Sequence, residues 1–327
     1  MNKTTLKLKF VDFYDGFVWD SHCLYKFLFK HFELELSDTP DLIIYSCYGT
    51  EFLKYSCPRV FYTAENIRPD FRFCDFAVSF DYNNYPNHFR MPLYSAYFTN
   101  QNLTKKRDAK TLLHKKRGFC SFVVSNATET EQRISFFHEL SKYKEIASGG
   151  KYANNVGGPV ANKRDFISKY LFNIAFENSS YPGYTTEKIA EPWVEGCIPI
   201  YWGDSEITKE INPDCFINMH DYASFDAAIA HIKEVDASPE LQTKYLSAPF
   251  FKNNEVPEYL QDEVIAQKMK YFINQCLEGL PKKAATYWDT PYYYLLKFKV
   301  NLRHFRIVLI QSTIGMRLWV KIKNIFK

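Results

Sequence analysis

Short apolar runs alternate with amphipathic segments along the first hundred residues of the chain. The runs predict buried strands, and they cover residues 6–13, 41–49, 59–66 and 76–80. Apolar residues at helical spacing predict a helix over residues 21–32. Strands and helices that alternate in this way typically form a parallel sheet covered by helices. The first part of the chain therefore predicts one α/β domain.

The same alternation begins again after a polar, lysine-rich segment at residues 99–118, which we interpret as a linker. The strands predicted after it cover residues 119–126, 171–177, 197–203 and 216–222. The helices predicted there cover residues 129–143, 162–170, 224–235 and 258–279. The chain thus predicts two α/β halves with a cleft between them, divided into residues 1–115 and 116–289.

The last segment, residues 290–327, differs from the rest in charge. It carries eight Lys or Arg and no Asp or Glu, and its apolar residues recur at helical spacing. Its longest apolar run, residues 307–310, is far shorter than the roughly 20 residues that span a bilayer. We interpret it as a basic amphipathic helix that lies on an anionic membrane surface, or else packs on the body or on another subunit. No RNA-binding motif accompanies it, so a nucleic-acid partner is not expected.

Composition narrows the class and the compartment. At 46% hydrophobic and 24% charged residues, the chain of 327 residues has the composition of a globular protein. The N-terminus lacks the apolar core of a signal peptide, and the eight cysteines show neither C-x-x-C pairs nor zinc-ligand spacing. These features predict a cytoplasmic protein, peripheral on the membrane if the basic tail binds there.

The segment from residue 175 to residue 204 carries most of the candidate chemistry. A predicted strand ends near Glu177, a polar loop follows, and a helix is expected to begin near Glu187. Helix N-termini favour anions, Lys188 adds a cation, and Glu187 can accept hydrogen bonds from a ribose. Asn178 and Tyr184 lie in the same loop, so the set suits a nucleoside diphosphate. A solvated loop with an exposed Glu–Lys pair is the alternative.

The stretch FENSSYPGYTTEKIAEPWVEGCIPIYWG resembles the donor-binding signature of the α-1,3/α-1,4-fucosyltransferases, glycosyltransferase family 10. Agreement continues, in order, over RVFYTAENIRPDF, FAVSFDY, RMPLY, FCSFVVSN, GGKYANNVGG and FINMHDYASFDAAI, so that it spans about residues 59–233. The resemblance is to the bacterial type. It implies a GT-B architecture of two Rossmann-like domains, in which residues 1–115 bind the acceptor and residues 116–289 bind GDP-fucose.

The resemblance also implies a reaction and its residues. Inverting transfer of L-fucose needs a base for the acceptor hydroxyl, and the family's proposed base matches Glu65. Arg133 and Lys188 match cations that stabilise the diphosphate as it leaves. The positions that match residues holding the nucleotide and the fucose are Asn178, Tyr184 and Glu187.

Three positions depart from what the signature or a regular helix would favour. Gly183 stands where many members have Asp, Thr185 stands where many have Val, and Pro192 falls inside the predicted helix. No D-x-D motif is present, so no divalent metal is expected to be required, although a stimulatory metal stays open.

The expected acceptor is O3 or O4 of GlcNAc or Glc in a lactosamine-type glycan, within bacterial surface polysaccharide or lipopolysaccharide O-antigen synthesis. A GT-B enzyme that uses another sugar nucleotide, or a membrane-associated glycan-binding protein without activity, are the alternatives.

Overall fold

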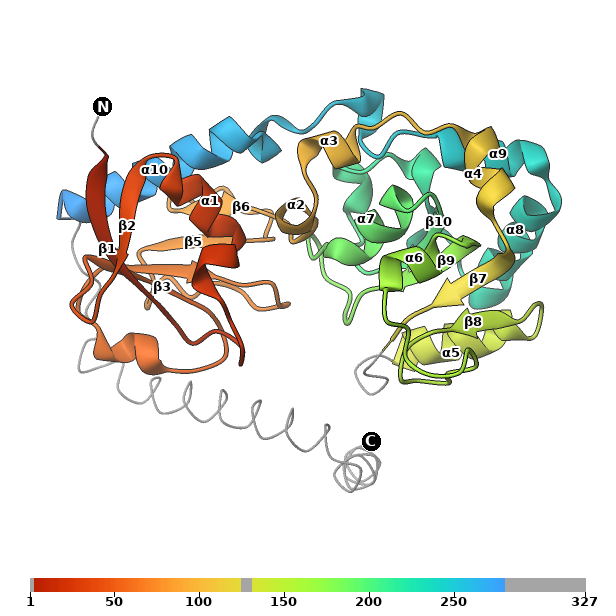
Figure 1. Ribbon diagram of the computed structural model, residues 1–327, viewed down its shortest axis with the longest axis horizontal. Helices are drawn as coiled ribbons and strands as arrows, with labels where there is room; N and C mark the ends of the chain where they lie inside the picture. The colour runs from red at the N-terminus through yellow and green to blue at the C-terminus, as the bar shows by residue number, and fades with distance from the viewer. Residues whose placement is uncertain (1–2, 125–130, 280–327) are drawn as a thin grey trace, which may run out of the picture. The chain divides into compact units, whose positions relative to one another are not determined.

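The computed structural model describes residues 3–124 and 131–279 (Figure 1). These residues form two compact units, each built on a parallel sheet with helices packed against it. The described part of the first unit comprises residues 3–79, 83–91 and 262–279, and the second unit comprises residues 80–82 and 92–261 apart from the gap. The predicted basic tail at 290–327 lies outside the described residues, so it stays a prediction.

The first unit contains a six-stranded parallel sheet among its described residues, in the order β2-β1-β3-β4-β5-β6. Its strands are β1 (Thr4–Val11), β2 (Phe32–Leu36), β3 (Leu42–Tyr45), β4 (Arg59–Tyr62), β5 (Phe76–Ser79) and β6 (His88–Arg90). The central strands β3, β4 and β5 are buried along their whole length, as expected of strands covered on both faces. Two α-helices pack against each other in this unit, α1 (Cys23–Phe29) and α10 (Asp262–Leu277).

The sequence predicted four of these strands and missed two at the edges of the sheet. The helix predicted over residues 21–32 ends at Phe29, and β2 begins at Phe32 after a short turn. Within β2 apolar and polar residues alternate, with Glu33 and Glu35 exposed on the last strand of the described sheet. Edge strands are short and carry charges, so their pattern differs little from that of an amphipathic helix end.

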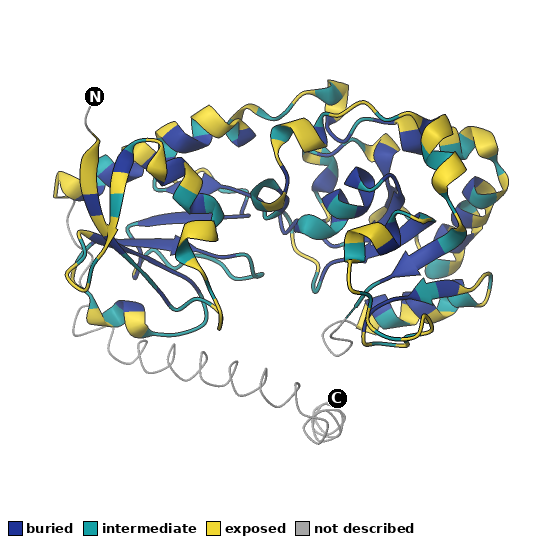
Figure 2. Ribbon diagram, in the orientation of Figure 1, coloured by how far each residue is buried: buried dark blue, intermediate teal, exposed yellow. Residues whose placement is uncertain are grey.

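The second unit contains a five-stranded parallel sheet among its described residues, in the order β11-β10-β9-β7-β8. Its strands are β7 (Gly118–Phe122), β8 (Ile146–Ser148), β9 (Tyr170–Phe176), β10 (Ile198–Trp202) and β11 (Ile217–Asn218). Its α-helices are α2 (Tyr94–Tyr97), α3 (Asn100–Leu103), α4 (Ala109–Lys115), α5 (Glu131–Ser141), α6 (Lys163–Ile167), α7 (Glu187–Val194), α8 (Phe225–Ala237) and α9 (Pro239–Ser247). Figure 2 shows buried strands between helices whose outer faces are exposed.

Short 3-10 helices connect several of these elements. They cover Trp19–Ser21, Glu51–Lys54, Ile207–Lys209, Pro213–Cys215, Met219–Asp221, Lys252–Asn254 and Glu258–Leu260. The last of these, Glu258–Leu260, lies at the start of the helix predicted over residues 258–279, which in the structure begins at Asp262.

The boundary between the units differs from the predicted one. The chain enters the second unit at residue 92, and the lysine-rich segment taken as a linker contains α3 and α4. This segment packs on the second unit: its Leu103 and Ala109 are buried in hydrophobic clusters of that unit, and the Arg107 guanidinium lies 4.8 Å from the Trp193 ring. The helix α10, placed by prediction in the second domain, returns to the first unit, where Phe272 stacks on Phe76 at 4.3 Å.

Each sheet changes direction of winding at one pair of neighbouring strands. In the first unit β2 and β3 lie on opposite sides of β1, and in the second unit β8 and β9 lie on opposite sides of β7. Connections that leave a parallel sheet in opposite directions open a crevice at the carboxyl ends of the two strands, where ligands bind. The topology therefore predicts ligand binding at two switch points, β1/β3 and β7/β9.

Candidate functional site

The strand–loop–helix segment predicted between residues 175 and 204 is present. Strand β9 ends at Phe176, and α7 begins at Glu187 with Thr186 as its N-cap residue. The Thr186 hydroxyl accepts a hydrogen bond from the Lys188 N–H at 3.4 Å. The start of α7 lies beside the carboxyl end of β9, where its dipole favours an anion.

Two buried carboxylates hold the loop between β9 and α7 in place. Glu177, with no exposed surface, accepts hydrogen bonds from the N–H and the hydroxyl of Thr186, each at 2.7 Å. Asp204, after β10, accepts a bond from the Gly183 N–H at 2.7 Å and one from the Thr185 hydroxyl at 3.0 Å. A loop tied to two neighbouring strands keeps one shape, which is a requirement for precise ligand contacts.

These bonds explain two of the three unusual positions in the sequence. Gly183 has a φ of +84°, a left-handed conformation that residues with a Cβ adopt only under strain. The Thr185 hydroxyl binds Asp204, a bond that a Val could not make. Pro192 lies inside α7, which nevertheless continues to Val194. Because proline has no backbone N–H, the helix lacks one hydrogen-bond donor at this position.

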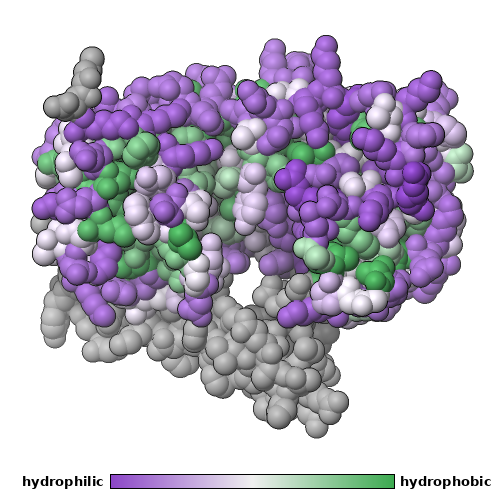
Figure 3. All heavy atoms as spheres, viewed as in Figure 1, coloured by the Kyte–Doolittle hydropathy of each residue, from purple (hydrophilic) through white to green (hydrophobic). Residues whose placement is uncertain are grey.

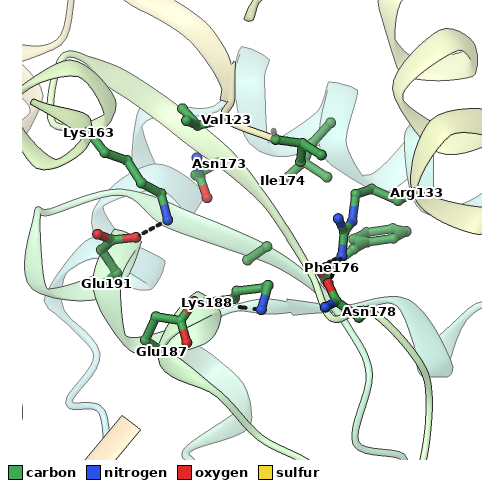
Figure 4. Close-up of a pocket in the computed structure, with 12 residues that line it drawn as sticks. Val123, Arg133, Lys163, Asn173, Ile174, Phe176, Asn178, Glu187, Lys188 and Glu191 are labelled. Atoms are coloured by element: carbon green, nitrogen blue, oxygen red, sulfur yellow. Dashed lines mark hydrogen bonds and ion pairs between the residues drawn. The ribbon is translucent and has the colours of Figure 1, made fainter. Parts of the chain in front are cut away.

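A cavity of about 260 Å³ opens at the β7/β9 switch point (Figure 4). It is bounded by the residues that follow β7, by the carboxyl-terminal half of β9, and by α5, α6 and the first turns of α7. The residues that line it are Val123, Val124, Arg133, Lys163, Asn173, Ile174, Ala175, Phe176, Asn178, Glu187, Lys188 and Glu191. Its apolar strand residues and convergent charged groups are what a small-molecule site requires.

Lys188 joins the two acids at the start of the helix. Its Nζ lies 3.3 Å from Glu177 Oε2 and 3.6 Å from Glu187 Oε1. Burial by itself would lower the pKa of Lys188, but the two carboxylates outweigh it and hold the pKa above its ordinary value. Burial would likewise raise the pKa of Glu187, but Lys188, together with hydrogen bonds at the helix start and Lys163, outweighs it and holds that pKa below its ordinary value. Both groups are therefore charged at neutral pH.

Arg133 reaches the cavity from α5. It is buried, and its Nη2 donates to the Phe176 carbonyl at 3.0 Å and to Asn178 Oδ1 at 2.7 Å. These bonds fix the guanidinium at the end of β9, as Figure 4 shows. A planar guanidinium held in this way is suited to two parallel hydrogen bonds with a phosphate.

The structure brings together four of the predicted site residues: Arg133, Asn178, Glu187 and Lys188 all line the cavity. Tyr184 is not among the lining residues, because its ring is buried against Phe80 at 5.0 Å between ring centres. The contact of Tyr184 with a ligand stays a prediction.

Glu65 belongs to the first unit, in the loop after β4. Its Oε1 accepts a hydrogen bond from the Tyr48 hydroxyl at 2.8 Å, and its N–H donates to the Thr63 hydroxyl at 3.0 Å. Tyr48 follows β3, so both side chains lie at the carboxyl edge of the first sheet. Glu65 thus has the position expected of a residue that meets a ligand, while its action as a base stays a prediction.

Sequence reasoning missed a second charged pair in the cavity, Lys163 and Glu191, which form an ion pair. Glu191 lies four residues after Glu187, so the two share a face of α7. That spacing was a usable signal for Glu191. Lys163 carried no such signal, because it stands at the start of α6, outside the signature. Sequence reasoning also missed Glu177 and Asp204, the two acids that hold the loop. Their function depends on being buried, which the sequence does not show.

Groups of three or more His, Cys, Asp or Glu residues that could hold a metal ion do not occur among residues 3–124 and 131–279. Within the same ranges, each helix is too short or too polar to cross a membrane.

Two family models match the chain, one over the strands of the first sheet and one over the strands of the second. Residues 8–97 match the model described as the alpha-(1,3)-fucosyltransferase FucT N-terminal domain. Residues 113–276 match the model described as glycosyltransferase family 10 (fucosyltransferase) C-term. The second match covers about half of the chain.

Similar proteins include the alpha-(1,3)-fucosyltransferase FucT of Helicobacter pylori, 30% identical over 82% of this chain and 64% of its own length. A putative fucosyltransferase of Acanthamoeba polyphaga mimivirus is 32% identical over 50% of this chain and 29% of its own length. The chain thus spans less than two thirds of the length of either relative.

Solved structures confirm the predicted GT-B fold. A crystal structure of an alpha1,3-fucosyltransferase with GDP-fucose superposes with a TM-score of 0.70 at 27% identity, over 85% of this chain and 92% of that one. The Anabaena protein HepE, solved in complex with UDP and glucose, shares the fold at 9% identity and a TM-score of 0.50, over 83% of this chain and 100% of that one. From the matched family models, the chain belongs to glycosyltransferase family 10, the family of the fucosyltransferases.

Proposed function

We propose that the protein transfers L-fucose from GDP-fucose to a hydroxyl of a glycan, with inversion at the anomeric carbon. The observation that carries the proposal is the cavity at the β7/β9 switch point, where Arg133, Lys163 and Lys188 meet the start of α7. Three cations and a helix N-terminus suit a diphosphate, and Glu187 suits ribose hydroxyls.

In the proposed reaction Glu65 removes the proton of the acceptor hydroxyl. The freed oxygen forms a bond to C1 of fucose on the face opposite the diphosphate, and the bond from C1 to the diphosphate oxygen breaks. Negative charge then grows on GDP as it leaves, and Arg133 and Lys188 stabilise that charge more in the transition state than in the ground state. Asn178 and Tyr184 are proposed to hold the nucleotide or the fucose.

The acceptor, the membrane and the metal requirement belong to the same proposal. We propose O3 or O4 of GlcNAc or Glc in a lactosamine-type glycan of the bacterial surface, such as lipopolysaccharide O-antigen. The basic tail would hold the enzyme on the cytoplasmic face of the inner membrane, because it carries eight Lys or Arg and no acid. Turnover is proposed to need no divalent metal, since the cations of the cavity can neutralise the diphosphate.

The decisive test is incubation of the full chain with GDP-fucose and a panel of lactosamine-type acceptors, with the linkage of the product read by NMR. An α-1,3 or α-1,4 fucosyl product supports the proposal, and absence of transfer from GDP-fucose contradicts it.

Calorimetry with GDP, UDP and ADP separates the sugar-nucleotide classes: preference for UDP would favour another GT-B transferase. Complete, reversible loss of turnover in EDTA would contradict metal independence.

The membrane proposal is tested by liposome flotation. Full chain should bind vesicles that contain anionic lipid, and a chain shortened after Asp289 should not. Persistent binding of the shortened chain would assign membrane contact to another surface.

A further inference from the structure

Aromatic side chains gather at the carboxyl edge of the first sheet, on β1 and on the segments that follow β1 and β3. We call this set the aromatic surface; it comprises Phe10, Phe13, Tyr14, Phe17, Trp19 and Tyr48. Phe10 contacts Phe17 at 5.5 Å and Trp19 at 6.4 Å between ring centres. Tyr14, which is 54% exposed, contacts both Phe17 and Tyr48.

One end of the aromatic surface borders a cavity of about 420 Å³. The cavity lies between the ends of β1 and β2, and its lining is made up of Lys9, Phe10, Phe17, Trp19, Leu36, Ser37 and Asp38. Lys9 and Asp38 form an ion pair at 2.7 Å on its rim, and Leu36 is 46% exposed. Figure 3 shows hydrophobic residues reaching the surface of the first unit among polar ones.

The other end of the aromatic surface reaches Glu65. The Tyr48 ring lies 6.2 Å from the Tyr14 ring, and the Tyr48 hydroxyl donates to Glu65 Oε1 at 2.8 Å. Ring contacts thus run without a break from Trp19 to Tyr48 within one unit, and the hydrogen bond from Tyr48 continues them to Glu65. A ligand whose hydroxyl meets Glu65 can extend over these rings toward the cavity.

We propose that this cavity is an acceptor subsite that holds a sugar unit beyond the one that receives fucose. The proposal rests on the proposed function, in which Glu65 meets the reacting hydroxyl. It makes the acceptor an oligosaccharide longer than a disaccharide, with Trp19 and Phe17 as specificity-determining residues.

The chemistry of the cavity fits a sugar ring. A pyranose has a face of C–H groups that packs on an aromatic ring, and hydroxyls around its edge that need polar partners. Trp19 and Phe17 offer rings, and Lys9, Ser37 and Asp38 offer donors and acceptors at the rim. A purely apolar ligand would leave the ion pair on the rim without new partners, so it fits less well.

The test compares two acceptors, N-acetyllactosamine and its tetrasaccharide with two repeats, in the full chain and in variants. The wild-type chain should show a higher kcat/KM for the tetrasaccharide. Trp19→Ala should lower kcat/KM for the tetrasaccharide about three- to tenfold through KM, the size expected for one lost aromatic contact, and leave the disaccharide unchanged. Leu36→Ala, at an exposed position, should give a smaller loss for the tetrasaccharide alone.

Two controls separate recognition from folding. Trp19→Phe keeps a ring and should restore most of the tetrasaccharide preference. Tyr271→Ala removes an exposed aromatic ring on α10 of the same unit and should change neither acceptor. Equal kcat/KM values for the two acceptors in the wild-type chain, or an equal loss for both in Trp19→Ala, would overturn the proposal.

A binding measurement keeps the test independent of turnover. In saturation-transfer NMR, the sugar unit remote from the reacting one should receive saturation in the wild-type chain and lose it in Trp19→Ala. If no fucose is transferred to any acceptor, the proposed function fails, but this measurement still decides whether the cavity holds a sugar. Saturation of decanoate without saturation of the tetrasaccharide would assign the cavity to an acyl chain and overturn the proposal.

Discussion

The two units have the same kind of switch point but line it differently. At β7/β9 charged side chains of the cavity form pairs, Lys188 with Glu187 and Lys163 with Glu191, and the buried Glu177 also contacts Lys188. At β1/β3 the edge is aromatic, with the carboxylate of Glu65 bonded to the Tyr48 hydroxyl. Paired charges suit a charged diphosphate, whereas aromatic rings beside the carboxylate of Glu65 suit a neutral sugar that must lose a proton. On the proposed function, one topology thus serves two ligand chemistries, because the sheet supplies position and the loops supply the chemical groups.

The largest effect on turnover is expected from substitution of Glu65 in the first unit. Glu65→Gln keeps the side chain's size and its bond to Tyr48 but removes the base, so kcat should fall by about 10²–10⁴ while the affinity for GDP stays unchanged. Steady-state kinetics and calorimetry measure the two quantities. Glu51→Gln, at an exposed position of the same unit, is the control; equal kinetics in both variants would remove Glu65 from the mechanism.

The second largest effect is expected for Lys188→Ala. Loss of a cation aimed at the leaving diphosphate should lower kcat by about 10²–10³ and weaken GDP binding, in contrast to Glu65→Gln. Glu177 would also lose its buried partner, so the melting temperature should fall. Lys252→Ala removes an exposed lysine from the same unit and should alter neither quantity. Retained GDP affinity in Lys188→Ala would place the diphosphate elsewhere.

A smaller effect is expected from alanine substitution of two glycines. It separates a change in the shape of the loop between β9 and α7 from the general cost of backbone strain. Gly183 and Gly16 have nearly the same φ, +84° and +82°, but lie in different units. Alanine at either position should cost about 1–3 kcal/mol of stability. Gly183→Ala should also weaken GDP binding, because the Gly183 N–H is tied to Asp204 beside the cavity, and Gly16→Ala should not. Chemical denaturation and calorimetry provide the comparison, and identical GDP affinities would show that the loop tolerates the change.

The smallest effect concerns acid sensitivity of the first unit. Burial, and then Arg90, lowers the pKa of His88 from 6.5 to about 4. The unfolded chain binds a proton at a higher pH than the folded chain, so the stability that neutral His88 contributes is complete above pH 6.5 and is lost as pH falls toward 4. At pH 5 the loss should be about 1–2 kcal/mol.

Chemical denaturation of wild type and His88→Gln at pH 7.5 and pH 5 measures this loss of stability. The free energy of unfolding should fall less between these two pH values in the variant than in wild type. His114→Gln, at an exposed position of the second unit, should behave as wild type. An undiminished loss in His88→Gln would assign the acid sensitivity to other groups.

Much of the second unit's site was readable from sequence because its parts lie close together in the chain. Asn178, Glu187 and Lys188 fall within one strand–loop–helix segment, and short-range rules place its strand end and helix start. Lys163 and Asp204 could not be assigned in this way, because each reaches the site through a different strand or helix. The lysine-rich segment at 99–118 failed for a related reason: its buried Leu103 and Ala109 are too sparse to stand out among exposed lysines.

The sequence by itself determined the alternation of strands and helices, the α/β class, the helix start at Glu187 and, by its signature, the family. These depend on local spacing and on capping, which act between residues a few positions apart. The tertiary structure alone decided the order of strands, the placement of α10 in the first unit, the pairing of Lys163 with Glu191, and the burial of Tyr184. These depend on which apolar surfaces cover one another, and packing between segments far apart in the chain leaves no periodic mark on either segment.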